Sequence, residues 1–168
     1  MVKENPVKML KREELLKEFE GYSYTGGGVK ALMQHVAQRM HEEMARYNWV
    51  GFYFMEAPNY DALVLGPYVG SFNPWTRIPL EKGLCGAAAS SGQTVAVNNV
   101  AKDPRYIGSD LVKSNMIVPI KVKGRVVAEL CIESYFTDTF DAGEQAFVEG
   151  CAELVGRGMD RDGAGQGR

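Results

Sequence analysis

Three cysteines are the most reactive side chains in this 168-residue sequence, and their spacing limits the chemistry they could perform. Cys85, Cys131 and Cys151 form no C-x-x-C pair, and only two histidines are present. A structural zinc site needs four Cys or His ligands at close spacing, and a disulfide framework needs more cysteines in a shorter chain. We therefore expect no metal site and no cofactor. If the thiols have a chemical role, it is as redox groups.

Cys85 lies in the stretch RIPLEKGLCGAAASSGQT, residues 77–94, and two interpretations of it are open at this point. In the first, Cys85 follows Gly83 at the start of a short helix, where backbone N–H groups and nearby Lys82 would lower the thiol pKa. In the second, the run of small residues allows close packing of a helix on a sheet, and Cys85 is a small apolar residue there.

Helical periodicity near both ends of the chain predicts the elements that would support such a site. Residues 11–20 predict a short amphipathic helix, which the glycine-rich segment GYSYTGGG ends. A longer helix is expected from Val29, because apolar residues recur there at spacings of three and four. A third is expected after Asp141, which suits an N-cap, and it would bury Cys151 as a core residue.

Between these helices the sequence changes to extended patterns. Strands are predicted in NWVGFYFM, ALVLGPYVG and TVAVNNV, and NMIVPIKVKGRVVAELCIES predicts two more that are joined by a turn at Lys123-Gly124. This order predicts an α+β fold, with an antiparallel sheet of five to six strands and the N- and C-terminal helices on one face. The connections from Tyr68 to Asn115, including a short helix around Cys85, would cover a pocket on the other face.

Composition restricts the class of protein and its partners. The chain has 19 Lys and Arg against 21 Asp and Glu and is 45% hydrophobic, so it should fold as a globule. Without a basic cluster, nucleic acid is not an expected partner. Neither a signal peptide nor an apolar run of membrane-spanning length is found, so we expect a cytoplasmic protein that does not bind membranes.

Five blocks of this sequence together resemble a known family. NWVGFYFM, LVLGPYVG, TRIPLEKGLCGAAASSGQT, SNMIVPI and LCIES followed by FTDTFDAGEQ are similar, in order and spacing, to the GAF domains of the free methionine-R-sulfoxide reductases. The resemblance implies a GAF fold with a small-molecule pocket. We divide the chain into an N-terminal helix and glycine-rich linker (1–28), a GAF domain (29–158) and a disordered tail (159–168).

The resemblance also implies what the cysteines would do. The family reduces free methionine-R-sulfoxide by thiolate attack, a second thiol forms a disulfide, and thioredoxin reduces it. The family's catalytic cysteine corresponds to Ser109 here, a second family cysteine corresponds to Trp75, and the third is Cys85. A serine hydroxyl cannot replace the nucleophile, because it ionises far less readily and has no disulfide state. This favours the packing interpretation of Cys85.

The residues implied to contact the ligand differ as well. The family holds the substrate's ammonium group with carboxylates, and the corresponding positions are Asn115, Cys131 and Glu133, so two of the three acids have become uncharged. Trp49 and Tyr53 correspond to the aromatic wall of the family's pocket.

We therefore predict a stand-alone GAF-domain protein that binds a small molecule through the eight positions Trp49, Tyr53, Trp75, Cys85, Ser109, Asn115, Cys131 and Glu133, without the reductase activity. One alternative is an L-methionine (R)-S-oxide reductase that uses a rewired Cys85/Cys131 thiol pair, with thioredoxin as partner. Another is a GAF sensor that acts through a separate protein. A homodimer formed through the terminal helices is also expected.

Overall fold

The computed structural model describes residues 3–72 and 74–163. Within that part of the chain the elements are α1 (Pro6–Tyr22), α2 (Gly28–Glu43), β1 (Trp49–Met55), β2 (Ala62–Gly70), β3 (Arg77–Pro79), α3 (Gly83–Ser91), β4 (Val95–Val97), the 3-10 helix η1 (Val100–Lys102), β5 (Ser114–Val122), β6 (Arg125–Ser134) and α4 (Ala142–Arg161). The mixture of helices and strands confirms the predicted α+β class.

The six strands form one sheet in the order β3-β2-β1-β6-β5-β4, and every neighbouring pair is antiparallel. The predicted turn at Lys123-Gly124 joins β5 to β6, and both of its residues have positive φ, as a tight hairpin turn requires. Strand β3 is a correction to the sequence analysis, which placed no strand in 77–79. Three residues are too few to show an alternating pattern.

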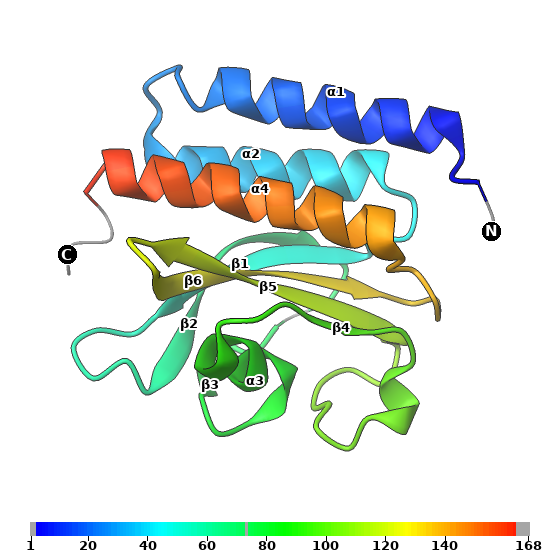
Figure 1. Cartoon of the computed structure of the whole chain (residues 1–168). Coiled ribbons are helices and arrows are strands. Elements are labelled where there is room, and N and C mark those ends of the chain that lie inside the picture. The colour runs from blue at the N-terminus through cyan, green and yellow to red at the C-terminus, as the bar shows by residue number, and fades with distance from the viewer. Residues whose placement is uncertain (1–2, 73, 164–168) are drawn as a thin grey trace.

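Helices cover one face of the sheet in two layers (Figure 1). Helices α2 and α4 pack directly on the strands, and α1 lies outside them, in contact with both helices. Leu15 and Phe19 of α1 are almost fully buried and join the same hydrophobic cluster as Phe52, Met116 and Leu130 of the sheet. Helix α1 is therefore part of the main core, although it packs mainly on α2 and α4 rather than on the sheet.

Helix α3 and long loops cover the opposite face. Alternation along β6 separates the two sides, because Leu130 and Ile132 belong to the cluster under the helices while Cys131 belongs to a second cluster under α3. This second cluster includes Trp49 and Tyr53 of β1, so the sheet has two buried faces.

The C-terminal helix is longer than the sequence indicated. The disordered tail was expected to start at residue 159, but α4 continues to Arg161 and Met159 is 2% exposed. Beyond the helix, Asp162 accepts a hydrogen bond from the backbone N–H of Val29 at 2.8 Å, which ties this end to the start of α2. The rest of the predicted tail, residues 164–168, lies outside the described residues.

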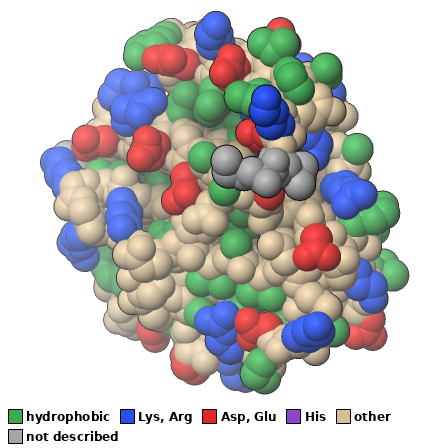
Figure 2. Space-filling model, turned by 45° about the vertical axis from the view of Figure 1, so that its right-hand side comes forward, with side chains coloured by type: hydrophobic (Ala, Val, Ile, Leu, Met, Phe, Trp, Pro, Cys, Tyr) green, Lys and Arg blue, Asp and Glu red, His purple; other side chains and the backbone are tan. Residues whose placement is uncertain are grey.

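Charged side chains of both signs are interspersed over the face that Figure 2 presents. In the part of the chain that the structure describes, no helix is both long and apolar enough to cross a membrane.

Candidate functional site

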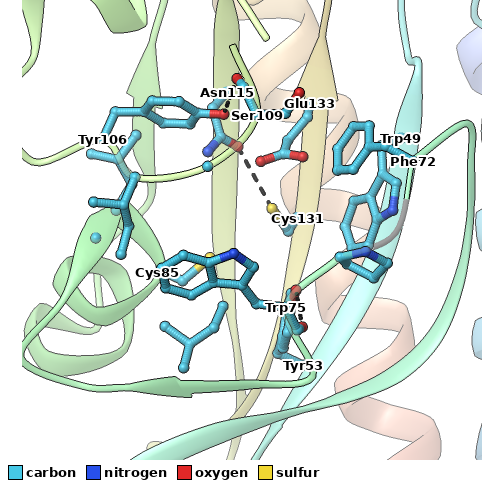
Figure 3. A pocket seen from close by; sticks show the side chains of 16 residues that line it. Trp49, Tyr53, Phe72, Trp75, Cys85, Tyr106, Ser109, Asn115, Cys131 and Glu133 are labelled. Carbon is cyan, nitrogen blue, oxygen red and sulfur yellow. Dashed lines mark hydrogen bonds between the residues drawn. The ribbon is translucent and has the colours of Figure 1, made fainter. Parts of the chain in front are cut away.

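A cavity of about 310 Å³ lies between the sheet and the segments that cover its α3 face. Strands β1, β5 and β6 form its floor, and α3 and the loops before β3 and β5 form its walls (Figure 3). The structure brings all eight predicted site residues to this cavity. The lining also includes residues that the sequence analysis did not select: Phe72, Pro74, Ile78, Gly83, Leu84, Tyr106, Ile107 and Gly108.

Trp49 forms one wall of the cavity, and two glycines leave the space that its ring occupies. Its indole ring lies over Gly51 and Gly70, where any Cβ atom would collide with the ring. The ring also stacks on Tyr68 and Phe72, with centroid distances of 5.7 and 6.0 Å. Glycines that look like interruptions of β1 and β2 are therefore what allows an aromatic wall here.

Trp75 stands at the rim of the cavity with half of its surface exposed. Its backbone carbonyl accepts a hydrogen bond of 2.9 Å from the Tyr53 hydroxyl, which rises from the sheet. This bond fixes the rim segment to the cavity floor. Trp49 and Trp75 are the only tryptophans in the chain, so both indole rings border the same cavity.

Ser109 lies in the loop that leads from Tyr106 toward β5. Its hydroxyl oxygen accepts the backbone N–H of Leu111 at 3.2 Å, and its carbonyl accepts the Tyr106 hydroxyl at 3.1 Å. The side chain thus stabilises its own loop. The correspondence of Ser109 with the family's catalytic cysteine stays a prediction.

Asn115 and Glu133 are cross-strand partners on β5 and β6 and present an amide and a carboxyl to the cavity. Asn115 is 3% exposed, and its Oδ1 accepts a weak hydrogen bond from the Cys131 thiol at 3.6 Å. Burial raises the pKa of Glu133 to about 7. Near neutral pH the protonated form, which can donate a hydrogen bond, and the carboxylate form of Glu133 are therefore both populated.

The two thiols of the cavity lie close enough to interact. A hydrogen bond with Cys131, followed by burial, raises the pKa of Cys85 well above its usual value. The same hydrogen bond lowers the pKa of Cys131, but burial and the nearby carboxyls of Glu133 and Glu129 outweigh it, so this pKa is raised too. The first interpretation of Cys85, in which the helix start and Lys82 lower its pKa, is wrong, because the thiol faces the buried sheet beside Cys131.

Glu129 is the functional candidate that the sequence analysis missed. It lies two residues before Cys131 on the same face of β6 and is 0% exposed. The sequence did contain a signal for Glu129: side chains alternate along a strand, so Glu129, Cys131 and Glu133 must lie on the same face of β6. What the pattern could not show is that α3 covers this face and removes it from water.

Cys151 lies outside this site. It is 0% exposed within the cluster under the helices, and burial raises its thiol pKa. The prediction that it is a core residue is confirmed. Among residues 3–72 and 74–163, no three His, Cys, Asp or Glu side chains converge so that they could hold a metal ion.

Comparisons with known proteins agree with this architecture. Residues 29–159 match the model of the GAF domain family. The free methionine-R-sulfoxide reductase of Saccharomyces cerevisiae is 30% identical over 154 residues, which cover 86% of this chain and 83% of the yeast protein. Protein YtsP of Bacillus subtilis is 29% identical over 146 residues, with 86% and 88% of the two chains covered.

Solved structures give the same result. The free methionine-R-sulfoxide reductase from Neisseria meningitidis, solved in complex with its substrate, matches with a TM-score of 0.86 and 28% sequence identity. The match covers 97% of this chain and 96% of the Neisseria chain.

Proposed function

The chain belongs to the GAF domain family and is homologous to free methionine-R-sulfoxide reductases, and we propose that it binds a small molecule in the cavity under α3 without reducing it. The observation that carries this proposal is the state of the cavity thiols. The hydrogen bond with Cys131 and burial raise the pKa of Cys85. Burial and the nearby carboxyls of Glu133 and Glu129 raise the pKa of Cys131 despite that bond, so thiolate, which sulfoxide reduction needs as its nucleophile, is scarce at both positions. In the loop that borders the cavity, Ser109 offers a hydroxyl that already bonds Leu111.

The lining supports a ligand with an apolar body and one polar end. Trp49, Phe72 and Trp75 supply aromatic surface, and Asn115 with Glu133 supply the polar groups. With Glu133 only partly ionised near neutral pH, the cavity provides a weak counter-charge for an ammonium group. A free amino acid is therefore a poorer candidate than a neutral molecule of similar size that can both donate and accept hydrogen bonds.

Binding can be tested through the two tryptophans, because both border the cavity. Titration of the purified protein with a panel of small neutral and zwitterionic compounds should change its tryptophan fluorescence for true ligands. Trp75→Phe and Trp49→Phe variants would assign the signal. A ligand should also raise the unfolding temperature in proportion to its affinity and concentration. If no compound small enough for the cavity changes either signal, a binding function loses its support.

The lack of turnover is tested separately, by supplying free methionine-R-sulfoxide with dithiothreitol as reductant and a Cys85→Ser variant as control. We expect no turnover above the background rate. Turnover that disappears in the variant would favour the reductase alternative, with Cys85 as nucleophile. Ligand binding that depends on a second protein would instead favour the sensor alternative.

A further inference from the structure

Glu129 is the one buried charged residue of the sheet for which the proposed function gives no role. It lies in the middle of β6 with 0% exposure, and neither of its carboxyl oxygens has a well-formed hydrogen bond to any described residue. Burying an ionised carboxylate without a partner is very costly, so the group holds its proton instead. Burial, followed by the nearby Cys85 thiol, raises the pKa of Glu129 well above its usual value.

Glu129 is surrounded by thiol and amide side chains as well as by apolar ones. Glu129 and Cys131 lie two residues apart on the same face of β6, and Cys85 of α3 lines the same cavity as Cys131. Cys131 donates to Asn115 Oδ1 at 3.6 Å. These four side chains form a continuous path from the buried acid to the cavity. Figure 3 shows its outer part, with Cys131 joined to Asn115 by a dashed line and Cys85 bordering the same pocket.

We propose that Cys85 and Cys131 form a reversible disulfide when a small hydroperoxide enters the cavity, and that Glu129 is the general acid of this oxidation. The inference goes beyond the proposed function and does not depend on it, because the oxidant is a peroxide and not the bound ligand.

The reaction balances in two steps. In the small fraction of molecules in which Cys85 has lost its proton, the thiolate attacks the peroxide, and its S–O bond forms as the O–O bond breaks. The departing alkoxide or hydroxide takes up the proton that the thiol released and leaves as alcohol or water. The Cys131 sulfur then attacks the Cys85 sulfenic acid, forming the S–S bond and breaking the S–O bond. Glu129 protonates the departing hydroxide, and the proton released by Cys131 restores the acid. With hydrogen peroxide, two thiols and one peroxide give one disulfide and two waters.

The size of the cavity limits the oxidant to a small peroxide, and the exposure of each cysteine determines which of them can react. A cavity of about 310 Å³ admits a small peroxide, and Cys85 lines it while keeping partial exposure. Cys151 is fully buried on the other side of the sheet and serves as an internal control. Because both cavity thiols have raised pKa values, oxidation should be slow at neutral pH and should accelerate as the pH rises.

Disulfide formation would also change the cavity. It removes the Cys131 thiol proton that now bonds Asn115 Oδ1, which leaves this amide oxygen free for another donor. A ligand that binds Asn115 would therefore have different affinities for the reduced and oxidised forms, by linkage.

The test treats the full chain with hydrogen peroxide at pH 8 and maps cysteine peptides without reduction, with dimedone present to trap sulfenic acids. We expect a Cys85–Cys131 disulfide that dithiothreitol reverses, and an unmodified Cys151. In Cys131→Ser the dimedone adduct should accumulate on Cys85. In Glu129→Gln, which keeps the side chain's size, the same adduct should accumulate and the disulfide should form about 100-fold more slowly.

Two outcomes would overturn the proposal. In the first, both Cys85 and Cys131 remain free thiols after a peroxide treatment that is strong enough to oxidise the exposed methionines. The other is a Glu129→Gln variant that forms the disulfide as fast as the natural protein. Ligand binding is measured on the reduced protein by tryptophan fluorescence, so a negative result here leaves the proposed function untouched.

Discussion

Replacing Glu129 with glutamine should stabilise the protein, by an amount that grows with pH. Glu129 has a pKa well above 4.5 in the folded chain because it is buried, while the unfolded chain returns it to water. Between these two pKa values the folded state holds one proton more than the unfolded state, so unfolding becomes easier as pH rises. The stability associated with Glu129 is therefore complete below about pH 4.5 and decreases as pH rises through neutral.

The size of the effect follows from linkage. One bound proton of difference changes the free energy of unfolding by about 1.4 kcal/mol per pH unit. The difference accumulates over each pH unit between 4.5 and the raised pKa of Glu129 in the folded state. Glutamine has nearly the same shape and no proton to lose, so Glu129→Gln should match the natural protein near pH 4.5. Above pH 4.5 its advantage over the natural protein should grow by about 1.4 kcal/mol per pH unit until the raised folded-state pKa of Glu129 is reached.

Urea unfolding followed by circular dichroism at pH 5, 6, 7 and 8 measures this difference. The matched control is Glu133→Gln, since Glu133 lies on the same strand and has a pKa of about 7 in the folded protein. Its advantage should level off near pH 7, whereas that of Glu129→Gln should keep rising. A difference between Glu129→Gln and the natural protein that stays constant from pH 5 to pH 8 would refute the assignment of a buried, protonated carboxyl.

Three further substitutions test the packing of α1 on the core and of the Trp49 wall of the cavity. Phe19→Ala removes a fully buried ring and should cost about 3–5 kcal/mol in urea unfolding; a loss under 1 kcal/mol would mean that α1 is not part of the core. Gly51→Ala puts a methyl group into the Trp49 ring and should cost about 1–3 kcal/mol and shift its fluorescence; an unchanged emission spectrum would contradict this packing. Arg12→Ala leaves buried Glu144, 3.8 Å from the guanidinium, short of counter-charge and should cost about 3 kcal/mol, whereas unchanged thermal unfolding would show that the pair contributes nothing.

Local patterns in the sequence were sufficient for most elements of the fold. Helix and strand periodicities reflect which side chains share a face, and this depends only on neighbouring residues. The predicted hairpin at Lys123-Gly124 also rests on local geometry, because both residues must accept positive φ. Strand β3 and the full length of α4 were missed, since they depend on contacts with distant segments.

For the candidate site too, the residues could be predicted from the sequence but their protonation states could not. The resemblance selected eight residues that the structure brings to one cavity, and Trp49 and Tyr53 owe their shared face to the alternation of β1. Their chemical state could not be predicted. The helix start at Gly83 suggested a reactive Cys85, but the fold turns the thiol toward Cys131 and raises its pKa.

The sequence alone therefore determined the fold class, the order of most elements and the residues that share each strand face, because these follow from the spacing of neighbouring side chains. Only the tertiary structure decided which face is removed from water. Glu129 and Glu133 are both acids on one side of β6, yet α3 and the sheet bury Glu129 beside Cys85 while Glu133 faces the cavity. Burial depends on what packs above a strand, and those contacts come from segments distant in the chain.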